Sequence, residues 1–298
     1  MARTRKPSTS ATSPGRQRDA HARSRARQLI AAQQAASKRA ERRRRLLAVV
    51  GSVTAVLAFA IALVAVKLTA TPARAAASEA PASAAVVSQV TNVPAAVLAR
   101  AGTGQVATAL EPVKTPATPL TIGGKPAIVF VGEESCPFCA AERWPLIVAL
   151  SHFGTFSGLG STTSSATDVY PSTATFSFRT ASYHSSQLTL RTTELANNAG
   201  QPLQPLTSLD TKLIGRYDIP PYVNSADQSG AVPFLDIANH DVLAGAQYSP
   251  QVLAGLTSAQ IASQLRNPAS PVAQAIDGSA NVIIKAINSI LHDTPAHS

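Results

Sequence analysis

A buried strand that runs directly into a helix opening on two cysteines is the feature that most limits how this chain can fold. The strand pattern covers Ala127 to Val131, a loop follows from Gly132 to Ser135, and the helix opens with Cys136-Pro137-Phe138-Cys139. These are the only two cysteines among 298 residues. A short apolar run bounded by a loop, then an apolar face at helical spacing, predicts an α/β domain.

The position of both cysteines at a helix start explains their chemistry. Residues i and i+3 of a first helical turn lie on one face, so Cys136 and Cys139 can close a small disulfide ring. Backbone N–H groups are unpaired there and the helix dipole is positive, which favours a thiolate. Pro137 suits this turn because its missing N–H has no intrahelical partner. We therefore predict a nucleophilic Cys136, approached by the N–H groups of Phe138 and Cys139, and a shielded, resolving Cys139.

The helix terminus alone is too weak to activate this thiol fully. A free thiol with a pKa of about 8.5 is only a few per cent ionised near pH 7. Lowering that pKa by two units takes about 2.7 kcal/mol, whereas a helix terminus supplies about 0.3–2 kcal/mol. Hydrogen bonds must supply the rest, and the charges of Glu133 and Glu134 act in the opposite direction.

Other interpretations of the cysteine pair are a structural disulfide without turnover and half of a metal site. A metal site is disfavoured because a structural zinc needs four ligands. The chain has no second cysteine pair, and its six histidines are scattered. We expect no metal and no cofactor, and a redox dithiol is the best single interpretation.

The net charge of +10 belongs to one end of the chain. Residues 1–45 carry 14 Lys and Arg against two acidic residues, giving +12, and the other 253 residues carry 12 against 14, giving −2. The composition of this basic tail predicts disorder. A nucleic-acid or anionic-lipid arm is one interpretation. Because the arginines at 42–45 abut an apolar run, a membrane-topology signal is favoured, and we expect no nucleic-acid partner.

The apolar run from Leu46 to Val66 contains 21 residues without a charge. At roughly 1.5 Å per residue it spans about 31 Å, which matches the hydrocarbon core of a bilayer. A cleavable signal peptide is the alternative, with a small-residue site at 75–77, but signal h-regions are shorter. We expect a single-pass anchor at 46–68 that contacts membrane lipid, with residues 1–45 in the cytoplasm and an Ala/Pro-rich tether at 69–85 beyond it.

This orientation places the C-terminal part of the chain outside the cytoplasm, at the plasma membrane. Disulfides form and persist there, so a lone pair of cysteines is expected to be able to pair. Localisation and cysteine usage, two independent signals, agree.

The remaining apolar patterns predict short elements in one domain over residues 86–295, with a Ser/Thr-rich β/loop insertion at about 160–230. We expect a half-buried strand from Thr173 to Phe178, because its apolar residues alternate. The sequence Thr257-x-x-Gln260 is typical of a helix-capping box. The other expected elements are helices at 94–101, 209–216 and from 271, and strands at 110–114, 186–195 and 242–246.

A proline directly precedes the apolar run Phe234-Leu235-Asp236-Ile237. Proline removes a ladder hydrogen-bond donor, so it is tolerated at a sheet edge or at the first residue of a strand. A cis bond between Val232 and Pro233 would be uncommon, since about 5–6% of X–Pro bonds are cis.

The order of these elements resembles the thioredoxin-like fold, in which a CxxC helix meets a cis-proline loop that docks the substrate chain. The resemblance implies that Val232 and Pro233 flank Cys136, and that they bind substrate together with Pro137 and Phe138. The CPFC motif is similar to the Cys-Pro-aromatic-Cys of glutaredoxins, and valine before the proline is similar to periplasmic dithiol oxidants.

Four longer motifs point to one family. They are CPFCAAERW, VYPSTATFSF, PFLDI and SPQVLAGLTSAQIASQL. The segment from about Val90 to Ile290 is similar to the membrane-anchored, thioredoxin-like domain-of-unknown-function family numbered 929. The resemblance covers about two-thirds of the chain and implies the fold more directly than the activity.

Two functions are compatible with the sequence. The first is a membrane-anchored, extracytoplasmic thiol–disulfide oxidoreductase that acts on protein thiols or disulfides through a mixed disulfide. A separate electron donor or acceptor must recycle it, because the chain has no further cysteine. The alternative is a non-enzymatic, thioredoxin-like binding or scaffold module with a structural disulfide.

Overall fold

The computed structural model describes residues 80–114, 117–223 and 229–293. In this part of the chain no helix has the length and hydropathy needed to span a membrane. The expected basic tail (1–45), the anchor (46–68) and residues 69–79 of the tether lie outside the described residues.

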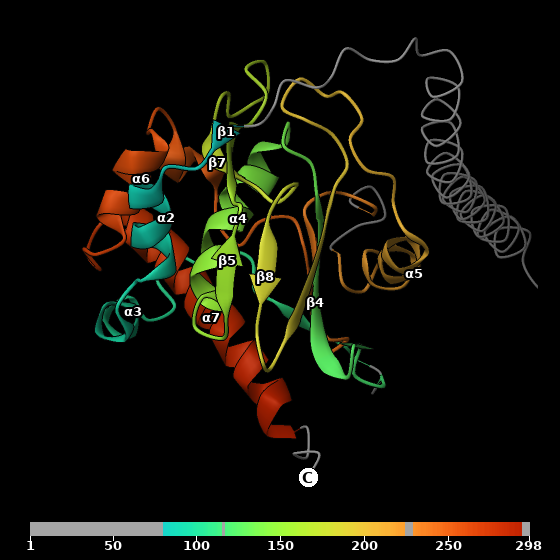
Figure 1. Cartoon of the computed structure of the whole chain (residues 1–298). Helices are drawn as coiled ribbons and strands as arrows, with labels where there is room; N and C mark the ends of the chain where they lie inside the picture. The colour runs from blue at the N-terminus through green and yellow to red at the C-terminus, as the bar shows by residue number, and fades with distance from the viewer. Residues whose placement is uncertain (1–79, 115–116, 224–228, 294–298) are drawn as a thin grey trace, which may run out of the picture. The chain divides into compact units, whose positions relative to one another are not determined.

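The main sheet is built around the strand that leads to the cysteines (Figure 1). Its strands are β2 (Glu111–Pro112), β3 (Thr121–Ile122), β4 (Lys125–Gly132), β9 (Thr189–Glu194), β10 (Phe234–Ile237) and β11 (Asp241–Ala244). β9 pairs in parallel with β4 on one side, and β10 pairs antiparallel with it on the other. β11 and β2 continue beyond β10, so the spatial order is β9-β4-β10-β11-β2, with β3 paired to the start of β4.

Helices cover both faces of this sheet (Figure 1). The helices are α2 (Ala84–Thr91), α3 (Ala95–Ala101), α4 (Pro137–Leu150), α5 (Ser208–Tyr217), α6 (Ser258–Gln264), α7 (Pro271–Asp293) and the 3-10 turn η2 (Pro250–Leu253). Ile128 and Phe130 of β4 share a buried cluster with α4 and α7, whereas Val129 and Val131 pack with side chains of α5. β4 is therefore buried on both faces, as its continuous apolar run indicates.

The segment between α4 and β9 supplies most strands of two small sheets. β5 (Thr155–Ser157) pairs with β8 (Ser182–His184). β6 (Gly160–Thr163) pairs with β7 (Ala174–Ser177) and with β1 (Ala80–Pro81). β1 and the start of α2 thus occupy residues 80–85, which the sequence assigned to the end of the tether.

β7 covers α4 and is buried on both faces, not half-buried as its alternation predicts. The Trp144 indole donates to the Ala174 carbonyl at 3.0 Å. The Thr175 hydroxyl donates to the Ala140 carbonyl at 2.8 Å. These hydrogen bonds satisfy polar groups that would otherwise be costly to bury, so polar residues on this strand do not mark a solvent face.

The structure differs from the predicted insertion at about 160–230. β9 forms a six-residue parallel ladder with β4, and α5 covers the opposite sheet face from α4. β9 and α5 therefore belong to the main sheet and to the layer that covers it, and the additional segment between α4 and β9 contains β5 to β8. The capping box at Thr257 and Gln260 is confirmed at the start of α6.

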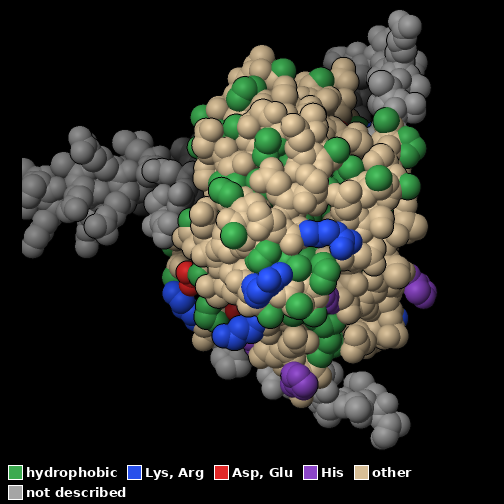
Figure 2. All heavy atoms as spheres, turned by 90° about the vertical axis from the view of Figure 1, so that its left-hand side faces the viewer, with side chains coloured by type: hydrophobic (Ala, Val, Ile, Leu, Met, Phe, Trp, Pro, Cys, Tyr) green, Lys and Arg blue, Asp and Glu red, His purple; other side chains and the backbone are tan. Residues whose placement is uncertain are grey.

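Figure 2 shows the face over α2, α3 and α6. Charged side chains are few on this face, where hydrophobic side chains are scattered among backbone and other uncharged side chains.

Candidate functional site

Cys136 is the N-cap residue of α4, directly after the loop that follows β4. Its backbone is extended (φ −78°, ψ 122°), and Pro137 occupies the first helical turn. Its sulfur accepts a hydrogen bond from the Cys139 N–H at 3.3 Å. The predicted arrangement of strand, loop and helix around Cys136 is confirmed. It could be predicted because all of its signals are local in sequence.

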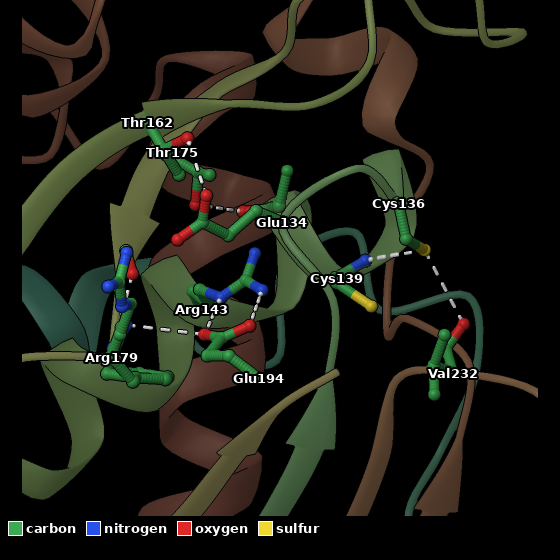
Figure 3. A network of polar contacts seen from close by, with 12 residues as sticks. Glu134, Cys136, Cys139, Arg143, Thr162, Thr175, Arg179, Glu194 and Val232 are labelled. Carbon is green, nitrogen blue, oxygen red and sulfur yellow. Dashed lines mark hydrogen bonds and ion pairs between the residues drawn. The ribbon is translucent and has the colours of Figure 1, made fainter. Parts of the chain in front are cut away.

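The segment before β10 supplies the other side of the site. The Cys136 thiol donates to the Val232 carbonyl at 3.6 Å, and the bond between Val232 and Pro233 is cis. Antiparallel pairing of Phe234 with Val131 carries these residues to the end of β4. Figure 3 shows the Cys136 sulfur between the Cys139 N–H and the Val232 carbonyl. Two segments 96 residues apart in sequence therefore meet at one sulfur.

The two thiols differ in exposure. Cys136 is half-buried, whereas Cys139 has no exposed surface, and neither forms a disulfide in the structure. A Cβ added to Gly132 would lie 3.3 Å from the Cys139 sulfur, so this sulfur packs against the end of β4. An approaching molecule therefore meets Cys136 first.

The environment also separates the acidities of the two thiols. A hydrogen bond from the Cys139 thiol is the main cause that lowers the pKa of Cys136, and the N–H groups of Cys139 and Phe138 lower it further. Burial and the charge of Glu133 oppose this shift. Burial raises the pKa of Cys139 well above its usual value, and its contact with Cys136 raises it more. The surroundings therefore favour the thiolate at Cys136 more than at Cys139.

Phe138 and Pro137 contribute differently to the surface around Cys136. Pro137 is buried, while the Phe138 side chain is 39% exposed. The Phe138 ring meets Tyr170 edge-on, with centroids 5.9 Å apart. Tyr170 comes from the loop between β6 and β7, which is also joined to the cysteine loop by the Ser165 N–H and the Ser135 carbonyl at 2.9 Å. The additional hairpin therefore borders the cysteine motif.

A polar cleft of about 890 Å³ opens beside the same loop. Glu134, which follows β4, and Asn198, which follows β9, line it together with Thr162 and Arg179. The carboxyl ends of neighbouring parallel strands are where ligands commonly bind in open α/β sheets. The Thr162 hydroxyl donates to the Glu134 carboxylate at 3.2 Å, and Arg179 is exposed. Sequence patterns did not reveal this cleft, because its residues come from segments that lie far apart in the sequence, from Glu134 to Ser258.

A buried ion pair lies below the cysteines and also escapes sequence reasoning. Arg143 of α4 donates from Nε and Nη2 to the Glu194 carboxylate at 3.0 and 2.6 Å, and both side chains are fully buried (Figure 3). The sequence indicated this ion pair only through the presence of a charged residue, Arg143, four positions after Cys139.

The indole of Trp144 on α4 is buried and has no exposed surface. Among the residues that the structure describes, no group of three or more His, Cys, Asp or Glu side chains could hold a metal ion.

The family of the chain is established by comparison. No curated protein and no solved structure is found to match it. Residues 111–289, which contain the cysteine motif, β9, α5 and the segment before β10, match a family model described as a domain of unknown function, DUF929. The match covers more than half of the 298 residues, and the chain belongs to this DUF929 family.

Proposed function

We propose that this protein is a thiol–disulfide oxidoreductase of the thioredoxin-like type that acts through Cys136 and Cys139. The observation that carries the proposal is the geometry at Cys136. A half-buried thiol at a helix N-terminus accepts an N–H from Cys139 and contacts the carbonyl that precedes a cis proline. Hydrogen bonds to a sulfur favour its thiolate, which is the reactive form.

The arrangement of elements supports the fold assignment. The chain order β4, α4, β9, α5, β10, β11, α7 and the spatial order β9-β4-β10-β11 are those expected of a thioredoxin-like core. In such a core the helix with the cysteines follows the central strand, and a proline loop precedes the antiparallel neighbour. The contact between Cys136 and Val232 is consistent with this arrangement.

The reaction follows from the unequal thiols. The Cys136 thiolate attacks one sulfur of a substrate disulfide, the substrate S–S bond breaks, and the released substrate thiolate takes a proton. Cys139 then attacks the Cys136 sulfur of the mixed disulfide, and the second substrate sulfur leaves as a thiol. Two electrons pass from the dithiol to the substrate, and the reverse sequence oxidises a substrate dithiol.

The surroundings of Cys136 favour a protein substrate. The polar cleft, which Glu134 of the cysteine loop lines, and the exposed Phe138 ring together offer more surface than a small thiol needs. The chain contains no third cysteine, so a separate electron donor or acceptor must restore the pair. The apolar run at 46–66 supports a membrane-anchored enzyme with its reactive part outside the cytoplasm.

Trapping of the mixed disulfide tests this proposal. Cys139→Ala removes the resolving thiol, so Cys136 should accumulate disulfide-linked partners that a reducing agent releases. The double variant Cys136→Ala/Cys139→Ala is the control and should trap nothing. If the single variant traps nothing and the wild-type chain neither reduces insulin nor oxidises dithiols, the oxidoreductase proposal is wrong.

The reduction potential of the pair would fix the direction of catalysis. A value near about −120 mV indicates an oxidant, and one near about −270 mV a reductant.

A second candidate function is a binding or scaffold module in which the cysteines are structural. The cleft of about 890 Å³ favours it, because this cleft could hold a ligand without any redox step. Cys136→Ser/Cys139→Ser separates the two proposals. A cellular function that survives this change, but is lost on Arg179→Glu in the cleft, would support the binding module.

A further inference from the structure

Arg143 is a buried cation one helical turn beyond Cys139. Its Nε and Nη2 atoms are bonded to Glu194, and its Nη1 atom is buried without a hydrogen-bond partner among the described residues. Removing two charges from water is costly, and a buried ion pair often stabilises a fold no more than apolar side chains of the same volume would. The pair therefore calls for an explanation other than stability.

Gly132 brings the cation and the cysteine into one buried environment. It ends β4 and lies opposite Glu194 in the parallel ladder. A Cβ at this glycine would be 3.3 Å from the Cys139 sulfur and 2.8 Å from the Phe130 ring. The Arg143 guanidinium lies 5.6 Å from the centre of the same ring. Charges interact strongly in such a water-poor setting.

We propose that Arg143, held in place by Glu194, is a positioning residue for the resolving step, and that its charge stabilises the Cys139 thiolate as it attacks the mixed disulfide. This inference rests on the proposed oxidoreductase function. In that step a bond forms between the sulfurs of Cys139 and Cys136, and the bond from Cys136 to the substrate sulfur breaks. The proton of Cys139 ends on the departing substrate sulfur.

The state of Cys136 explains why Arg143 acts at this step and not earlier. In the resting dithiol, burial and then the hydrogen bond and charge of Cys136 raise the pKa of Cys139, while Arg143 lowers it. Cys139 therefore stays protonated and its thiol supports the Cys136 thiolate. Once Cys136 is joined to substrate, its sulfur carries no charge. Of the causes that raise the pKa of Cys139 in the resting dithiol, burial then remains and those from Cys136 are gone, so ionisation of Cys139 becomes easier.

The decisive measurement is the titration of Cys139 in the full chain with Cys136→Ala, which removes the Cys136 charge as a mixed disulfide does. Thiolate absorbance and the rate of alkylation by iodoacetamide are followed against pH. Glu194→Gln leaves the Arg143 charge without its counter-ion and should lower the pKa of Cys139. Arg143→Met/Glu194→Gln removes both charges and should raise it by about one unit, which is about tenfold less thiolate at a given pH.

These opposite directions distinguish an electrostatic role from a structural one. Loss of packing alone would shift Cys139 in the same direction in both variants, and that result would overturn the inference. Arg143→Lys keeps the charge and should retain a pKa close to that of the parent. Glu142→Gln, the neighbouring buried carboxyl, is the control and should leave Cys139 unchanged. Should the double variant fail to fold, a rise or no change in Glu194→Gln is sufficient to reject the inference.

The outcome is separable from that of the proposed function, since the titration needs no substrate. Shifts of the expected sign in a chain that reduces no disulfide would reject the oxidoreductase function alone. An active enzyme whose Cys139 titrates identically in all variants would reject the role of Arg143 alone.

Discussion

Glu142 provides a quantitative test of how α4 is buried. Its side chain has no exposed surface. One carboxyl oxygen accepts the Gln247 N–H at 3.0 Å, and the other has no hydrogen-bond partner among the described residues. Burial raises the pKa of Glu142 from 4.5 to about 8. The same region holds Tyr248 and Asp277; burial likewise raises the pKa of Asp277, to about 7.

The sign of the pH effect follows from this shift. Between pH 4.5 and 8 the folded chain keeps a proton on Glu142 that the unfolded chain has lost. The free energy of unfolding therefore falls as pH rises, by about 1.36 kcal/mol per pH unit for this one group. Its contribution is complete below the unfolded pKa and is lost as pH rises through the folded value. From pH 5 to pH 8 the loss is up to about 4 kcal/mol.

Glu142→Gln should remove this part of the pH dependence. The glutamine keeps a carbonyl acceptor for the Gln247 N–H and has no proton to lose. The free energy of unfolding is measured by urea denaturation of the full chain in detergent micelles at pH 5, 6, 7 and 8. As pH rises, the free energy of unfolding of the variant should fall less than that of the wild type. Asp168→Asn, at an exposed loop residue, is the matched control. Parallel curves for Glu142→Gln and wild type would refute the reasoning.

Two further substitutions test the geometry of the site. Gly132→Ala would place a methyl group 2.8 Å from the Phe130 ring and 3.3 Å from the Cys139 sulfur. We expect the free energy of unfolding in urea to fall by about 1–3 kcal/mol, and the disulfide to close more slowly in a thiol assay. Wild-type values in both measurements would contradict this packing. Arg179→Glu reverses the charge in the polar cleft and should raise KM for a protein disulfide about three- to fivefold, as for an exposed contact worth roughly 1 kcal/mol. Turnover of a small aromatic disulfide should not change. Lys285→Glu on α7 is the control, and equal KM values for Arg179→Glu and wild type would exclude the cleft from substrate recognition.

Local signals were sufficient to predict the strand, loop and helix around Cys136, because a turn of helix and its cap depend on adjacent residues. The contact with Val232 came from resemblance to a fold, not from a pattern in the residues. No local rule specifies which strand pairs with β4, so the β-like run at 186–195 could be predicted as extended but not as a core strand.

The composition of β9 explains why it was assigned to an insertion. Its first four residues are only half-buried, and Thr193 is buried through a hydrogen bond to Asp210 at 2.9 Å. Threonine and arginine at these positions are typical of a solvent-exposed strand. Thr193 is nonetheless buried, because its hydroxyl donates to Asp210 in the first turn of α5, and the sequence did not reveal where α5 lies in space.

The buried charges of α4 were missed for a related reason. A charged pair in a helix normally marks its solvent face, because most helices are covered on one side only. α4 contacts β7 and α7 as well as the sheet, so Glu142 and Arg143 are both fully buried. Periodicity cannot identify a helix covered on several sides, and the partners Gln247 and Glu194 lie 105 and 51 residues away.

The hairpin of β6 and β7 therefore has two separable consequences. Through Ala174 and Thr175 it covers α4 and helps bury the charges beneath the cysteines. Through Tyr170, which meets the Phe138 ring, it borders the cysteine motif, and its residues Thr162 and Ser172 line the polar cleft. Deleting the hairpin would expose α4 and change the thiol environment together with the surface, so loss of activity in a deletion would not identify a binding role. Only substitutions confined to the exposed residues can separate recognition of a substrate from the reactivity of the thiols.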